Sequence, residues 1–170
     1  IAETLKNKVS IWAKINLPEI RSSLQIQYEI FGNGELKVAY SFNPGTGLPD
    51  IPRIGLQMLI DQQYDDFEWF GRGPQESYAD RKESTYFGLH KASVKKDFFH
   101  YIRPQESNNK TDVYYAGLFN AAGNGIAMSS ETGLSLSAWP YSMEDIEQAS
   151  HTFKLTERSF ITLNIDKLQM

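Results

Sequence analysis

Several pairs of carboxylates in this sequence have side-chain types and a spacing that could support acid–base chemistry. Glycosidases place two carboxyl groups across the bond that they cleave and raise the pKa of one of them. Glu76 with Asp80, and Glu106 with Asp112, have usable spacing, but the chain has 21 acidic residues and such pairs are common. Spacing alone identifies no catalytic dyad, and we assign no catalytic residue.

A histidine beside a carboxylate is a second arrangement that could transfer protons. His100 and Glu106 are close in the chain, and such a pair could move a proton to a sugar oxygen. His151 follows a predicted helix, where a histidine more often caps the helix or packs in the core. There is no Gly-x-Ser-x-Gly elbow, and Gly71-x-Gly73 lacks the third glycine and the helix start of a nucleotide fingerprint.

Two dense stretches, residues 69–81 and 101–112, combine aromatic rings with charged and amide side chains. Sugar sites are typically built in this way, from aromatic platforms and side chains that match hydroxyl groups. The carbohydrate-facing candidates are Arg72, Glu76, Arg103, Glu106 and Trp139. The same aromatic rings would equally fill the core of a β-sandwich. The charges of 69–81 could also brace a structural corner, with an arginine paired to Glu76 or Asp80.

Composition excludes several classes of function. Cysteine is absent, which excludes disulfides, thiolate catalysis and cysteine-ligated zinc. The three histidines (His90, His100 and His151) follow no metal-binding spacing, so we expect no metal and no cofactor in this chain. The net charge of -4 comes from interspersed signs without a basic stripe, which argues against nucleic acid as a partner. No apolar run is long enough to span a membrane.

Alternating polar and apolar residues predict the strands that must position these side chains. Residues 9–17, 24–30 and 36–42 alternate with the period of two that is typical of half-buried strands. Gly32-Asn33-Gly34 lies between the last two and readily supplies the positive φ angles of a hairpin turn. Residues 53–60 predict a more fully buried strand.

The stretch 69–81 is predicted as a corner where a strand leads into a helix. The strand would end at Trp69-Phe70, the chain would turn through Gly71-Arg72-Gly73, and a helical turn would begin at Pro74. Further strands are predicted at residues 63–70, 83–94, 113–120, 125–130, 133–139, 151–155 and 160–165. A variant capping box at 142–145 predicts the best helix, at 143–149. Short strands at this spacing predict an all-β antiparallel sandwich or barrel.

We expect one domain, residues 1–170, excised from a longer polypeptide. The chain begins at Ile1 without an initiator methionine or a signal peptide, and it ends at Met170 in what reads as a strand leading into a loop. No internal repeat and no long linker marks a second domain.

Four ordered motifs lie between residues 50 and 170. They are Pro52-Arg53-Ile54-Gly55 with residues 69–81, then 101–106, then Pro140-Tyr141-Ser142 leading to His151, and finally Leu163-Asn164-Ile165-Asp166. Together they resemble the C-terminal (fifth, small-chain-like) domain of large bacterial β-galactosidases, glycoside hydrolase family 2. Residues 69–81 match the family pattern Trp-x-Gly-x-Gly-Pro-x-Glu-x-Tyr-x-Asp-Arg throughout. Ser107-Asn108-Asn109 departs from the Asn-Gly that usually follows the second motif.

The resemblance implies an antiparallel β-supersandwich like that of galactose mutarotases, here lacking its last strands. In the family, this domain closes over the active-site face of a separate (β/α) barrel that supplies both catalytic glutamates. A tryptophan that borders the sugar pocket comes from a segment that would follow Met170. Parent enzymes often use Mg²⁺ and Na⁺ in other domains. We expect a homo-oligomeric parent in the bacterial cytoplasm or periplasm.

By this resemblance the chain is a non-catalytic domain that is inactive alone and shapes the substrate cleft and subunit packing of a β-galactosidase. Its expected partners are the remaining domains of the parent and the galactoside substrate, which a carbohydrate-binding surface would contact. Two alternatives stay open. One is a mutarotase-like aldose epimerase with a histidine acid and a glutamate base, and the other is a simple carbohydrate-binding module.

Overall fold

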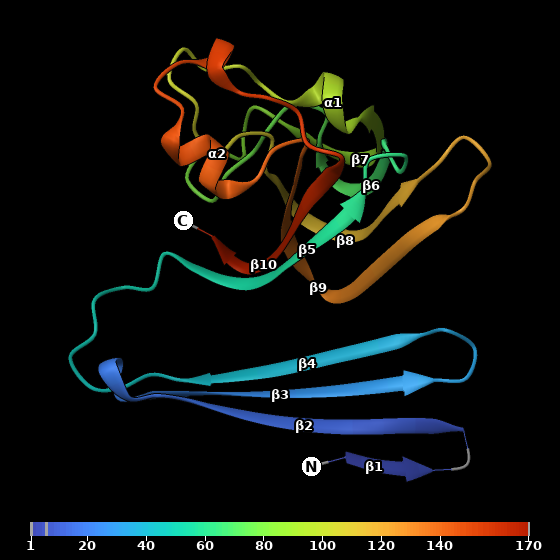
Figure 1. Ribbon diagram of the computed structural model, residues 1–170, viewed down its shortest axis with the longest axis vertical. Coiled ribbons are helices and arrows are strands. Elements are labelled where there is room, and N and C mark those ends of the chain that lie inside the picture. The colour runs from blue at the N-terminus through green and yellow to red at the C-terminus, as the bar shows by residue number, and fades with distance from the viewer. Residues whose placement is uncertain (1, 6, 170) are drawn as a thin grey trace. The chain divides into compact units, whose positions relative to one another are not determined.

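The structure is a computed structural model that describes residues 2–5 and 7–169, with side chains described for residues 7–167. Strands dominate, and they form two antiparallel sheets (Figure 1). The all-β prediction is therefore confirmed. The chain divides into two compact units, residues 1–51 and 52–170. The single domain over residues 1–170 stays a prediction.

The first unit is a four-stranded meander. Its strands, in their order across the sheet, are β1 (Ala2–Leu5), β2 (Lys8–Leu17), β3 (Ser22–Phe31) and β4 (Leu36–Asn43), with a short 3-10 helix at Pro18–Ile20. The hairpin between β3 and β4 closes with a hydrogen bond from Phe31 N to Glu35 O at 2.9 Å, and Gly34 has a φ of +89°. The predicted Gly-Asn-Gly hairpin is confirmed.

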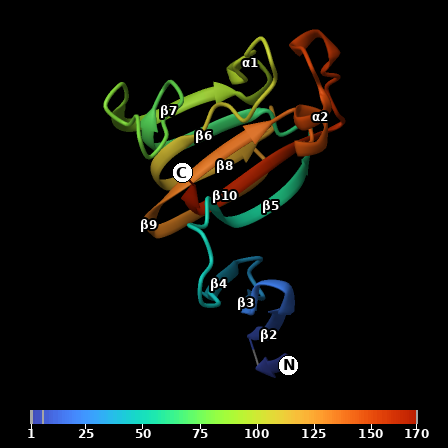
Figure 2. The ribbon, with the colours of Figure 1, turned by 90° about the vertical axis from the view of Figure 1, so that its left-hand side faces the viewer.

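The second unit is a six-stranded sheet with order β5-β10-β9-β8-β6-β7. Its elements are β5 (Arg53–Asp61), β6 (Asp66–Gly73), β7 (Tyr86–Ser93), α1 (Val94–Asp97), β8 (Lys110–Phe119), β9 (Gly125–Trp139), α2 (Met143–Gln148), a 3-10 helix (Thr152–Lys154) and β10 (Phe160–Gln169). Figure 2 shows β5 and β7 at opposite edges of this sheet.

The two faces of this sheet differ in polarity because successive side chains of a strand point to opposite faces. On β10, Ile161 and Leu163 belong to the main apolar core. Thr162, Asn164 and Asp166 alternate with them and are buried on the other face. That second face carries a smaller cluster of Phe98, Trp139, Tyr141 and Ile146, packed with Met143 and Leu155.

Helix α2 confirms the predicted helix at 143–149, with its last residue as the cap. Ser142 Oγ accepts from the backbone N of Asp145 at 3.1 Å, and an Asp145 carboxylate oxygen accepts from the backbone N of Ser142 at 3.0 Å. Arg158 also donates to both oxygens of Asp145. These contacts lower the pKa of Asp145 to about 2, chiefly through Arg158.

The predicted strand-to-helix corner at 69–81 is wrong. β6 continues through Gly73, and no helix follows it. The glycines permit close approach instead of a turn. A Cβ on Gly71 would lie 2.8 Å from Cα of Val113 on the neighbouring strand, and a Cβ on Gly73 would press on two aromatic rings at 2.9 and 2.9 Å.

Three other predictions are wrong. β5 alternates between half-buried and exposed residues because successive side chains point to opposite faces and one face is open to solvent. The two strands expected at 125–130 and 133–139 are one strand, since the turn-forming residues between them are taken up as a bulge against β8. Residues 151–155 form a 3-10 turn, closed by Leu155 N donating to Thr152 O, in place of a strand.

Candidate functional site

Arg53, at the start of β5, holds two carboxylates from distant parts of the chain. Its Nε and Nη2 donate to the two oxygens of Asp166 on β10, at 3.0 and 2.7 Å, in a bidentate pair. Its Nη1 donates to Oε1 of Glu106, in the loop between α1 and β8, at 2.6 Å. Three of the four sequence motifs therefore meet here, although Arg53 and Asp166 are 113 positions apart.

Gly55 makes room for this ion pair. Gly55 and Asp166 are partners across β5 and β10. A Cβ on Gly55 would lie 2.1 Å from Oδ1 of Asp166 and 2.4 Å from the carbonyl oxygen of Ile165. The position requires glycine because any larger residue would displace the carboxylate or the backbone.

The Asp166 carboxyl is far more enclosed than the guanidinium that binds it. Its side chain is 2% exposed, against 25% for Arg53. Burial is the largest influence and raises the pKa of Asp166, while the hydrogen bonds and charge of Arg53 act to lower it.

A row of amides continues this polar face across three strands. Gln57 Nε2 donates to Oδ1 of Asn164 at 2.9 Å, and Asn164 Nδ2 donates to Oγ of Ser137 at 3.0 Å. Gln57 uses its side-chain nitrogen in this row, and its side-chain oxygen has no hydrogen-bond partner among the described residues. A pocket of about 270 Å³ opens here, which we call the Arg53 pocket; it is lined by Arg53, Gly55, Leu56, Gln57, Met143, Asn164 and Asp166.

Glu76 links the 69–81 segment to the loop that carries Glu106. Its carboxylate accepts from Nη2 of Arg81 at 2.7 Å, from the backbone N of Asn108 at 2.9 Å and from the hydroxyl of Tyr101. The hydrogen bond to Glu76 is the largest of several influences that raise the pKa of Tyr101. Pairing of an arginine with Glu76, the bracing arrangement expected from the sequence, is confirmed.

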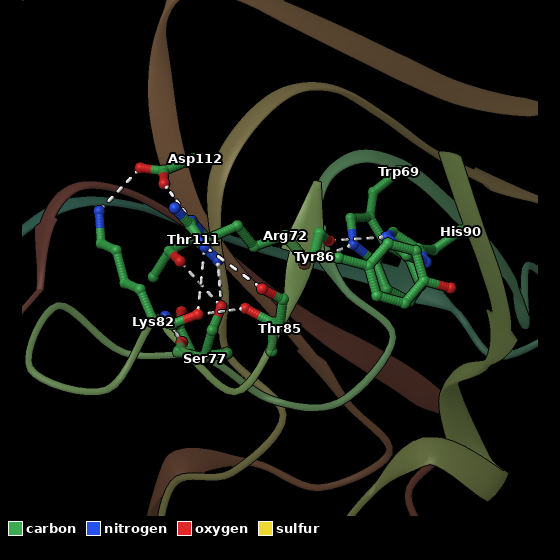
Figure 3. A network of polar contacts seen from close by, with 10 residues as sticks. Trp69, Arg72, Ser77, Lys82, Thr85, Tyr86, His90, Thr111 and Asp112 are labelled. Carbon is green, nitrogen blue, oxygen red and sulfur yellow. Dashed lines mark hydrogen bonds and ion pairs between the residues drawn. The ribbon is translucent and has the colours of Figure 1, made fainter. Parts of the chain in front are cut away.

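Arg72 belongs to a second polar network, shown in Figure 3. Its Nε donates to Asp112 Oδ2 at 2.8 Å, and Lys82 Nζ donates to Asp112 Oδ1 at 2.8 Å. Arg72 Nη1 also donates to the carbonyl oxygens of Lys82 and Thr85, at 3.2 and 3.3 Å. Burial acts to raise the pKa of Asp112, but the hydrogen bonds and charges of Lys82 and Arg72 outweigh it and lower that pKa.

Trp69 and Lys110 form the buried base of the 69–81 segment. The Trp69 ring stacks on His90 with centroids 5.2 Å apart, and its Nε1 donates to the carbonyl oxygen of Arg72. Lys110 is completely buried: its Nζ donates to the carbonyl oxygen of Pro74 at 2.8 Å and lies 4.8 Å from the centre of the Trp69 ring. Burial is the main influence that lowers the pKa of Lys110.

The five carbohydrate-facing candidates lie in different environments. Glu106 reaches the Arg53 pocket through its ion pair, while Arg72 and Glu76 lie in the two networks of the 69–81 segment. Arg103 is exposed. Trp139 is completely buried, and its Nε1 donates to the carbonyl oxygen of Ser107 at 2.8 Å, so no indole face is left for a sugar.

The histidines do not form the proton-transfer pair considered from the sequence. His90 is buried between Trp69 and Tyr86, and its Nε2 lies 3.3 Å from the Tyr86 carbonyl oxygen. His100 packs edge-on against Phe98. His151 stacks on the exposed ring of Phe153.

Sequence reasoning missed Arg53, Gln57, Asn164 and Asp166 as site residues. A signal was present, because Arg53 and Asp166 each belong to a motif that the sequence had singled out. Nothing in the local pattern indicates that the two motifs are adjacent in space.

The part of the chain that the structure describes holds neither a metal cluster nor a membrane-spanning helix. No group of three or more histidine, aspartate or glutamate side chains there is placed to hold a metal ion. No helix there is long and apolar enough to cross a membrane.

Comparison with known proteins gives a consistent result. A family model described as beta galactosidase small chain matches residues 2–170. A β-galactosidase of Priestia megaterium is 36% identical over 162 residues, which is 95% of this chain and 16% of the relative. A β-galactosidase of Lactobacillus delbrueckii subsp. bulgaricus is 35% identical over 155 residues, 91% of this chain and 15% of the relative. The chain thus spans about one sixth of these relatives.

Proposed function

Because this chain belongs to the β-galactosidase small-chain family, we propose that it is a non-catalytic domain of an enzyme that hydrolyses terminal β-galactosides. The relatives carry that activity in their names and are about six times longer than the matched region. By the family resemblance, the remaining length holds the barrel with both catalytic glutamates, and this domain shapes the substrate cleft and the packing of subunits.

The observation that supports a non-catalytic role is the state of the carboxylates. Glu76 is bound by Arg81, Asp112 by Arg72 and Lys82, and Glu106 by Arg53. A glycosidase needs one carboxyl group with a raised pKa that can give its proton to the leaving oxygen. Asp166 has a raised pKa, but both of its oxygens accept hydrogen bonds from Arg53 and face that side chain.

A chimaera tests the proposal directly. The matching 162 residues of the Priestia megaterium relative would be replaced by this chain, and hydrolysis of a chromogenic β-galactoside would be measured. We expect the chimaera to hydrolyse the substrate and the isolated chain, shown to be folded by circular dichroism, to give no turnover. The same relative with the matching region deleted is the control for what this domain contributes.

Either of two results would overturn the proposal. One is hydrolysis by the isolated chain that survives further purification and disappears in Glu106→Gln. The other is a folded chimaera that is as inactive as the deletion control. Polarimetry on freshly dissolved α-galactose separates the epimerase alternative, which predicts mutarotation faster than in buffer.

A further inference from the structure

The Arg53 pocket presents an unusual combination of groups for a surface that performs no chemistry. Its charged groups are fixed, Leu56 and Met143 line it beside the polar side chains, and it keeps hydrogen-bonding capacity that the protein does not use. We propose that it binds one neutral polyhydroxylated ring, of the size of a single hexose. This rests on the proposed function, in which the domain shapes the substrate cleft of a β-galactosidase. It places the sugar contact on β5, β10 and the start of α2 and not on the candidates Arg72, Glu76, Arg103 and Trp139.

The size of the pocket limits the ligand. Its volume is about 270 Å³, just below the roughly 300–1,000 Å³ of typical small-molecule sites. Since a water molecule takes about 30 Å³ of liquid volume, the pocket holds the equivalent of about nine waters. That space accommodates one sugar ring.

The charge of the pocket selects against ions. Arg53 contributes one positive charge, and Asp166 and Glu106 contribute one negative charge each when ionised. An anion would meet this net negative charge, and a cation would compete with an arginine that is already held by three hydrogen bonds. A neutral ligand avoids both penalties.

The unused hydrogen-bonding groups match hydroxyls. A guanidinium has five N–H donors, and Arg53 uses three of them on Asp166 and Glu106. The side-chain nitrogen of Gln57 donates to Asn164, so the Gln57 oxygen is the group left to accept from a ligand. A sugar hydroxyl both donates and accepts. Met143, half-buried in the pocket wall, offers an apolar surface for ring C–H groups.

The pocket is also rigid before any ligand arrives. Asn164 is 1% exposed and is fixed by hydrogen bonds on both sides. Asp166 is held by both of its oxygens, above a glycine that no other residue could replace without displacing it. Because the binding groups are already ordered, a ligand loses little affinity to ordering them.

Backbone amide NMR on this chain tests the inference, with galactose as the neutral probe and galacturonate as an anionic probe of the same size. We expect saturable shifts in residues 53–57 and 164–166 with galactose, and clearly weaker binding of galacturonate that recovers at high salt. Gln57→Ala removes one exposed hydrogen-bonding side chain and should weaken galactose binding about five-fold, the effect of about 1 kcal/mol. Gln63→Ala, an exposed glutamine outside the pocket, should leave binding unchanged.

Three results would overturn the inference: no saturable shift at the highest soluble galactose concentration, shifts that map away from the pocket, or equal binding by wild type and Gln57→Ala. Met143→Ala gives a second measurement should Gln57→Ala fold poorly, and it should also weaken binding. The outcome is independent of the chimaera. An active chimaera with no galactose binding refutes this inference alone, and galactose binding with an inactive chimaera refutes the proposed function alone.

Discussion

The Arg53 pocket and the 69–81 segment are both built from arginine–carboxylate pairs, yet they use these pairs differently. In the 69–81 segment, Glu76 with Arg81 and Arg72 with Asp112 tie neighbouring parts of the chain together. In the pocket, Arg53 joins two carboxylates and still borders open space. The charges of the 69–81 segment thus act as a brace, and the shorter Arg53 motif borders the open pocket.

The difference follows from where the glycines lie. Gly71 lets Val113 approach the backbone of β6, which closes that region. Gly55 leaves space over β5 that the Asp166 carboxylate enters, which creates a polar wall. At Gly71 the space that a side chain would fill is taken by the apolar residue Val113, and at Gly55 it is taken by the carboxylate of Asp166.

The largest expected effect comes from removing the arginine of each region. Arg53→Ala leaves Asp166 buried without its partner, and we expect a loss of about 3–5 kcal/mol in the free energy of unfolding. Arg81→Ala removes a side chain that is 53% exposed, and we expect at most about 1 kcal/mol. Urea denaturation of both variants measures the contrast. Equal losses would show that the two pairs are energetically alike and would remove the distinction between the regions.

Alanine at the two glycines should give a smaller effect and separate stability from binding. Gly55→Ala and Gly71→Ala each force backbone or side-chain shifts, and we expect a loss of about 1–3 kcal/mol in each. Only Gly55→Ala should also abolish galactose binding. Gly32→Ala is the control, because its nearest neighbour would be 4.0 Å away. Retained galactose binding in Gly55→Ala would contradict the role assigned to Asp166.

The smallest effect is on the pH dependence of stability, which should have opposite signs in the two regions. The pKa of Asp112 lies below its ordinary value of 3.8, so its contribution is present above that pH and is lost as pH falls through the folded-state pKa. The pKa of Asp166 lies above 3.8, so its contribution is present below 3.8 and is lost as pH rises through the folded-state pKa.

Carboxyl ¹³C NMR titration measures both groups directly, with Asp112→Asn and Asp166→Asn to assign the signals. Values on the same side of 3.8 would contradict the contrast. If Asp166 titrates below 3.8, the attraction of Arg53 outweighs burial in the pocket, as the attraction of Arg72 and Lys82 does at Asp112.

The elements that were predicted correctly from the sequence are those that depend on residues close together along the chain. Strands β2, β3 and β4 were found from their alternation, the β3–β4 hairpin from its glycines, and helix α2 from a cap that spans four residues. Each of these is decided by local geometry. The all-β class followed from the spacing of such elements.

What the sequence did not predict depends on residues that are distant along the chain. The glycines of 69–81 were interpreted as a turn because their close contacts lie on other strands. Trp139 was a carbohydrate-facing candidate with the core as its alternative, and the sequence did not show that α2 and the loop before β8 bury it. The Arg53 pocket needs two motifs brought together by the pairing of β5 with β10, and no local pattern specifies that pairing.

The alternation along β10 has a consequence for folding fidelity. Ile161 and Leu163 face the core, while Asn164 and Asp166 face the pocket. A slip of one residue against β5 would exchange these faces. Asn164 and Asp166 would then lie in the hydrophobic core, and Ile161 and Leu163 would lie among polar groups. Arg53 would lose its bidentate partner in the same step. The residues that form the pocket therefore also favour the native register of β10 against β5 over a register shifted by one residue.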